Sequence, residues 1–172
     1  MARKQVTVGS AAGAPPRTVD LRGFVASLTA ATDSARMDKA TKMLRADRFQ
    51  LFSEVTDTHL TGVVKSQTDP DLVYACRLSS TGEFCCCTQN LFACGGLRGA
   101  LCKHLLVLLV GLAQSGVLDP NAAHHWAKES RKKKPKLLSE TMSATFIKYK
   151  GAQAGEIDWR PTETIPEDYY AY

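Results

Sequence analysis

The stretch that decides the fold contains two short motifs, Cys85-Cys86-Cys87 and Cys102-Lys103-His104. Cys85 and Cys87 are two apart, fourteen residues (88–101) follow Cys87, and Cys102 and His104 are again two apart. The pattern therefore reads C-x-C, a gap, then C-x-H. Thiolate sulfur and imidazole nitrogen are ligands that suit a tetrahedral Zn²⁺ ion. The motifs predict a zinc site formed by Cys85, Cys87, Cys102 and His104.

The residues around the motifs indicate how they come together. Residues 83–88 read as a strand, in which side chains two apart point to the same face. Cys85 and Cys87 would then project together and Cys86 away from them. A helix would splay Cys102 and His104 apart, so we expect Cys102 just before a helix and His104 in its first turn. Backbone N–H groups at that helix start would stabilise nearby thiolates.

Other assignments of the cysteines stay open. Cys86 or Cys94 can replace a ligand in this set, and the thiols can also be apolar core residues, since cysteine is often buried. An iron–sulfur cluster would use Cys85, Cys87, Cys94 and Cys102, but the C-x-C start and His104 argue against it. Four of the six cysteines fall between positions 85 and 94, which favours a metal site over a spaced disulfide framework.

The remaining pattern predicts an α+β fold, with a small antiparallel sheet that has the zinc site at a strand–helix junction and is flanked by helices. Asp20 can cap a first helix, and Asp119-Pro120 is a strong start for a later one. In the last helix we expect Met142, Phe146 and Ile147 to point inward. The predicted helices are 21–29, 35–46, 103–115, 120–130 and 139–150, and the predicted strands are 49–55, 60–65, 72–78 and 83–88.

The chain divides into four segments by composition. We predict a flexible N-terminal arm at 1–18, a zinc-binding domain at 19–118, a helical extension with a basic run at 119–150, and an acidic, aromatic tail at 151–172. With 172 residues and 44% hydrophobic residues, the chain can form one core without relying on metal alone.

Membrane and secretory signals are missing from the sequence pattern. The longest apolar run, 105–113, is far shorter than the roughly 20 residues that a membrane span requires. Residues 5–16 contain no apolar run of the kind a signal peptide needs. We therefore expect an intracellular, cytoplasmic protein, in a reducing setting that keeps thiols available for metal.

Charge is mild overall but unevenly distributed. The net charge is +5, from 22 basic and 17 acidic residues. Five positive side chains gather in six positions, and clustered cations can contact nucleic-acid phosphates; an ordinary solvated charge run is the plain alternative. These candidate DNA contacts are Arg131, Lys132, Lys133, Lys134 and Lys136. The acidic tail, which ends in Tyr169-Tyr170-Ala171-Tyr172, can dock onto a partner protein.

The cysteine and histidine pattern resembles the SWIM zinc finger family, whose members carry C-x-C, a variable gap and C-x-H ahead of an apolar helix. The matching residues are Cys85, Cys87, Cys102 and His104, with the helix at 105–113, and the resemblance covers about 38–116. One departure is Thr88, where members of the family often have proline. The resemblance implies a module that binds DNA or protein through its strand–loop–helix surface.

These patterns predict a non-catalytic module that acts by binding a protein partner or DNA, with Zn²⁺ as its only cofactor and no small-molecule substrate. Four protein ligands would leave the metal no open position for water activation. A Cys102–His104 nucleophile is disfavoured because residues two apart on a helix do not face each other. The alternative that the resemblance implies is an adaptor subunit, docked through its tail in an assembly such as one with an AAA+ ATPase of the MoxR type.

Overall fold

Four antiparallel strands form a single sheet in the order β1-β2-β3-β4, so each strand pairs with its neighbour in sequence. The computed structural model describes residues 18–46 and 48–154. The elements follow one another as α1 (Leu21–Ala31), α2 (Ser34–Ala46), β1 (Gln50–Val55), β2 (His59–Lys65), β3 (Val73–Ser79), β4 (Phe84–Thr88), α3 (Lys103–Gln114), α4 (Pro120–Ser130) and α5 (Ser139–Ala154). The predicted α+β class with a small antiparallel sheet is confirmed.

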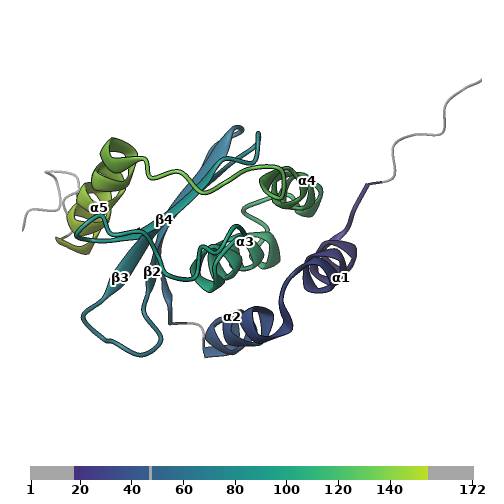
Figure 1. Cartoon of the computed structure of the whole chain (residues 1–172), viewed down its shortest axis with the longest axis horizontal. Helices are drawn as coiled ribbons and strands as arrows, with labels where there is room; N and C mark the ends of the chain where they lie inside the picture. The colour runs from purple at the N-terminus through teal and green to yellow at the C-terminus, as the bar shows by residue number, and fades with distance from the viewer. Residues whose placement is uncertain (1–17, 47, 155–172) are drawn as a thin grey trace, which may run out of the picture.

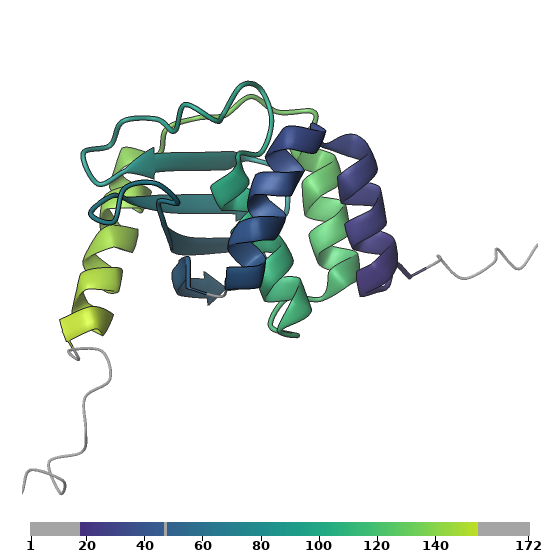
Figure 2. The same ribbon diagram turned by 90° about the horizontal axis from the view of Figure 1, so that it is seen from below.

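The sheet separates two unequal layers of helices (Figures 1 and 2). Helix α3 packs on β1, β2 and β3, and it contacts α1, α2 and α4 around it. Helix α5 packs alone on β2 and β3 from the other side. The larger core therefore lies between the sheet and α3, and a second, smaller cluster lies under α5.

Alternation along the strands explains this division, since successive side chains point to opposite faces. In the register of the sheet, Cys76 pairs with Cys86 and Ala75 pairs with Cys87. Cys76 and Cys86 belong to the core under α3, whereas Ala75 and Cys87 belong to the cluster under α5. Each strand thus supplies both layers, and neighbouring residues have different surroundings.

Helix α3 lies close to the sheet because of a glycine. A Cβ on Gly62 would lie 2.6 Å from Cδ1 of Leu108 and 2.6 Å from the carbonyl oxygen of Phe52. Leu108 has no exposed surface. The absence of a side chain in the middle of β2 therefore lets the helix approach the sheet.

The helix starts follow their capping residues. Asp20 accepts a hydrogen bond from the backbone N–H of Gly23 (2.8 Å) at the start of α1. Asp119 accepts one from the N–H of Ala122 (3.2 Å) at the start of α4, which has Pro120 in its first turn. Both caps were predicted, and each satisfies an N–H that has no partner inside the helix.

Three further predictions concern the ends and faces of the chain. In α5, Met142 and Phe146 are buried, but Ile147 is 70% exposed, so its predicted inward orientation is wrong. In the predicted helical extension (119–150), helix α4 packs Trp126 and its neighbours into the core that also includes α1 and α3. The predicted arm (1–18), apart from Thr18, and most of the tail (151–172) lie outside the described residues. In the described part of the chain, no helix is both long and apolar enough to cross a membrane.

Candidate metal centre

The loop after β4 brings Cys94 beside Cys86. After Thr88 the chain turns back, with Leu91 in the left-handed region (φ 62°). The returning segment pairs with the strand that it has just left, because the N–H of Thr88 donates to the carbonyl of Phe92 and the N–H of Cys94 donates to that of Cys86, both at 2.9 Å. Cys94 is therefore fixed next to Cys86 by backbone hydrogen bonds.

The other two side chains come from the start of α3. Cys102 is the N-cap residue, with extended backbone angles, and its thiol makes no capping hydrogen bond. His104 lies in the first turn of the helix. Both positions were predicted from the sequence. They direct one thiol and one imidazole toward Cys86 and Cys94.

The four side chains form a compact group. One ligand atom from each of Cys86, Cys94, Cys102 and His104 lies within 4.8 Å of all the others. Nδ1 of His104 is 3.9 Å from Sγ of Cys86, 3.4 Å from that of Cys94 and 3.9 Å from that of Cys102. A tetrahedral zinc ion with Zn–S of about 2.3 Å and Zn–N of about 2.0 Å would separate nitrogen from sulfur by about 3.5 Å. The group therefore has the size of a tetrahedral metal site.

The group is buried, and the ionisation of its thiols depends on whether a cation is bound. Burial raises the pKa of the Cys86 and Cys102 thiols well above the usual value. Hydrogen bonds with three neighbours hold the pKa of Cys94 far below its usual range. The bond with Cys102 has the largest effect, and those with Cys86 and His104 add to it. Burial therefore disfavours the ionised form of the Cys86 and Cys102 thiols when no cation is bound. A bound dication would offset the cost of burying further thiolates and make their ionisation favourable.

Neighbouring side chains fix the orientation of His104. The ring of Tyr74 stacks on the imidazole, with centroids 3.8 Å apart and planes 17° from parallel. Cys76 lies behind the group, with its Sγ 3.7 Å from that of Cys86. Nε2 of His104 is buried and has no hydrogen-bond partner among the described residues.

Cys85 and Cys87, two of the four predicted ligands, lie elsewhere. The structure brings Cys102 and His104 together with Cys86 and Cys94, and places Cys85 and Cys87 in the cluster under α5. The predicted alternation along the strand is present, because Cys85 and Cys87 do share a face. The face that points to α3 is the opposite one, which carries Cys86.

The Cys85–Cys87 pair has its own chemistry. A hydrogen bond from Cys87 lowers the pKa of the Cys85 thiol to about 7, and the same bond raises the pKa of Cys87. The interaction between the two thiols therefore favours the thiolate at Cys85 over that at Cys87. Met142 and Phe146 of α5 pack in the same cluster.

The predicted DNA-contacting run crosses from α4 to the sheet edge. Its five basic side chains, Arg131, Lys132, Lys133, Lys134 and Lys136, are all exposed. Lys132 forms an ion pair with Glu129 (2.8 Å). The backbone N–H of Lys136 donates to the carbonyl of Phe84 (3.2 Å), which ties the end of the run to the start of β4.

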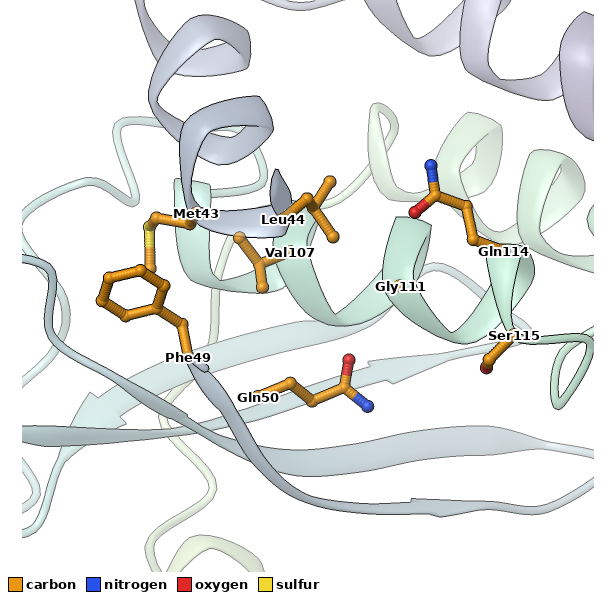
Figure 3. Close-up of a pocket in the computed structure, with 8 residues that line it drawn as sticks. All are labelled: Met43, Leu44, Phe49, Gln50, Val107, Gly111, Gln114 and Ser115. Atoms are coloured by element: carbon orange, nitrogen blue, oxygen red, sulfur yellow. The ribbon is translucent and has the colours of Figure 1, made fainter. Parts of the chain in front are cut away.

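A separate cavity of about 360 Å³ opens between α2, α3 and β1 (Figure 3). Apolar side chains such as Met43 and Phe49 line one part, and the amides of Gln50 and Gln114 line another. The one hydroxyl that lines it, that of Ser115, donates to the carbonyl of Leu112 (3.1 Å). This cavity has no titratable side chain in its lining and so offers no acid or base for catalysis.

Comparison with known proteins gives no relative from which to transfer a function. No family model, no curated protein and no solved structure matches the chain. The interpretation of the site therefore depends on its own geometry: a buried Cys/His group that can hold a metal ion, located where β4 and α3 meet.

Proposed function

We propose that this chain is a non-catalytic zinc-binding module that holds Zn²⁺ through Cys86, Cys94, Cys102 and His104 and acts by binding nucleic acid. The observation that carries the zinc assignment is the arrangement of three sulfurs around Nδ1 of His104, at 3.4–3.9 Å. Zinc fits this set better than magnesium or calcium, because those ions prefer oxygen ligands.

A structural role suits four protein ligands. Three thiolates and one imidazole would complete a tetrahedral shell and leave no position for water or substrate. The metal would join β4, the loop at Cys94 and the start of α3, so that its binding energy would stabilise the fold. In this proposal zinc positions a surface and takes part in no reaction.

The relation to the SWIM family remains a proposal. The second half of the pattern, Cys102-x-His104, fits the family at the start of an apolar helix. The first half departs from it, because Cys86 and Cys94 are eight positions apart and the C-x-C pair, Cys85 and Cys87, faces α5. If zinc binds as proposed, the second half of the zinc-binding motif is SWIM-like and its first half is different.

Metal analysis of matched variants tests the ligand set. The purified chain should contain about one zinc per molecule. Cys86→Ala, Cys94→Ala and His104→Ala should each lose most of that metal, because each removes a ligand. Cys85→Ala and Cys87→Ala are the matched controls, since they remove a buried thiol from the same strand, and they should retain the metal.

The opposite pattern would assign the site differently. Loss of zinc in Cys85→Ala and Cys87→Ala, with retention in Cys86→Ala and Cys94→Ala, would restore the ligand set predicted from the sequence. A folded wild-type chain without metal would contradict the zinc proposal altogether. Replacing Zn²⁺ with Co²⁺ adds a spectroscopic check, since the visible spectrum distinguishes tetrahedral thiolate coordination.

A further inference from the structure

A basic groove begins beside the metal centre and consists of two adjoining cavities. The first, of about 420 Å³, is lined on one side by Cys94 and His104 of the centre. The second has a volume of about 330 Å³ and extends toward the end of α4. The cavities share Asp33, Arg36 and Arg98. They therefore form one continuous concave surface.

The groove is strongly positive. Its charged lining consists of five cations and one acid: Arg36, Lys39, Arg98, Lys103, Arg131 and Asp33. Asp33 accepts a hydrogen bond from the backbone N–H of Arg36 (3.2 Å), so its carboxylate is partly used in starting α2. The positive charge of the groove is thus largely uncompensated from within.

The cations of the groove are not neutralised by ion pairs, and two of them are oriented by neutral acceptors. None of the five forms an ion pair with any residue in the described ranges, where the two ion pairs are Lys132–Glu129 and Lys148–Glu54. Nη1 of Arg36 donates to the carbonyl of Leu101 (3.1 Å), and Nζ of Lys103 donates to Oε1 of Gln67 (3.4 Å). Neutral acceptors orient these groups and leave their charge available to an anion.

His104 provides a second, independent indication of an anion. It is 3% exposed, it lines the first cavity, and its Nε2 has no partner among the described residues. When Nδ1 faces a metal, Nε2 carries the ring proton and normally donates it to an acceptor. An anion in the first cavity would lie beside this ring, whose Nε2 has no acceptor among the described residues.

We propose that this groove binds the phosphate backbone of a nucleic acid strand. A single phosphate would need only one of the cavities, whereas two cavities in series suit a chain of linked phosphates. Arg131 ends the groove and begins the exposed basic run, so the positive surface continues into Lys132, Lys133 and Lys134. The metal centre would position the wall formed by Cys94 and His104. This inference rests on the proposed function and names the surface that performs it.

Binding to a fluorescent oligonucleotide tests the groove. The probes are a single-stranded DNA 20-mer and its duplex, titrated by anisotropy with the zinc-loaded full chain from 50 to 300 mM NaCl. The variant K39Q/R98Q removes two exposed cations and should fold normally. The control R22Q/K150Q makes the same change in charge at exposed positions that do not line the groove. K39Q/R98Q should weaken binding roughly tenfold or more and lower the salt slope by about one to two, and the control should change it little.

The outcomes separate this inference from the proposed function. Equal affinities for K39Q/R98Q, R22Q/K150Q and the wild type would overturn the groove, while binding itself would still support the module. No binding of either probe at 50 mM NaCl would overturn nucleic-acid binding as a whole. A stronger effect on the single strand or on the duplex would identify which form supplies the phosphates. Zinc content of each variant, measured in the same samples, shows whether a loss of binding comes from a lost metal.

A second pair of variants tests the interior of the groove. Arg36→Gln removes the guanidinium shared by both cavities, and Arg36→Lys retains its charge. If the groove binds phosphate, Arg36→Lys should recover part of the affinity that Arg36→Gln loses. Equal losses in the two variants would show that Arg36 acts only through its contact with Leu101, which contradicts its assigned role.

Discussion

The two faces of the sheet carry the same residue type and use it differently. Under α3, Cys86 joins Cys94, Cys102 and His104 in a group of metal-site dimensions. Under α5, Cys85 and Cys87 lie in an apolar cluster with Met142 and Phe146. The spacing of cysteines along one strand is therefore not sufficient to identify which of them can bind a metal. The elements that pack on each face determine whether a thiol has ligand partners or apolar neighbours.

Removal of the metal should have the largest effect on stability, and it should affect the α3 face of the sheet more than the α5 face. Zinc in comparable sites contributes on the order of 10 kcal/mol of binding free energy, which is as large as the total stability of a typical domain, about 5–15 kcal/mol. Chelation of the zinc-loaded chain should therefore lower its melting temperature sharply. Hydrogen exchange should show the greatest loss of protection in residues 94–106, where the loop and helix start depend on the ligands.

The control for this experiment is α5, which packs on β2 and β3 on the other face of the sheet. Its amides should lose less protection than those at the start of α3. If chelation released α5 first, or left the melting temperature unchanged, the metal would not be what holds the α3 face together.

The region from β4 to the start of α3 shows best how much of the structure could be predicted from the sequence. Capping chemistry is local, so Asp20 and Asp119-Pro120 were sufficient to locate two helix starts. The positions of Cys102 before α3 and His104 in its first turn also followed from local geometry. The order and direction of the strands followed from short turns between alternating segments.

The grouping of Cys86 and Cys94 with Cys102 and His104 needed tertiary information. Three consecutive cysteines place a thiol on both faces of β4, so alternation alone cannot select the face. One signal was present, because Phe84 and Cys86 share a face, and a buried phenylalanine identifies the side of the main core. Cys94 gave no such signal. Its position depends on the backbone hydrogen bonds that return the chain along β4 after Leu91.

A pair of core truncations sharpens the comparison of the two faces. Leu108 packs over Gly62 in the main core and Met142 packs in the cluster under α5, and neither has exposed surface. Leu108→Ala should cost near the upper end of about 2–5 kcal/mol, because α3 is surrounded and cannot move to fill the cavity. Met142→Ala should cost about 2–3 kcal/mol, since α5 packs on one side only and can shift.

Urea unfolding at constant zinc measures both variants. The larger cost should belong to Leu108→Ala, and Met142→Ala should retain its full metal content. A larger cost for Met142→Ala would mean that the cluster under α5, and not the core under α3, dominates the stability of the chain.

The smallest expected effect concerns the ion pair that joins α5 to the sheet edge. Nζ of Lys148 lies 2.8 Å from a carboxylate oxygen of Glu54 on β1, and the two side chains are 52% and 43% exposed. Exposed pairs contribute about 0–1 kcal/mol, because water screens the charges and both side chains lose freedom. A double-mutant cycle with Glu54→Gln and Lys148→Met should give a coupling below about 1 kcal/mol that disappears in 0.5 M NaCl. A coupling above about 2 kcal/mol that persists in salt would mean that α5 is held by charge as well as by Met142 and Phe146, and the two faces would then differ in kind and not only in size.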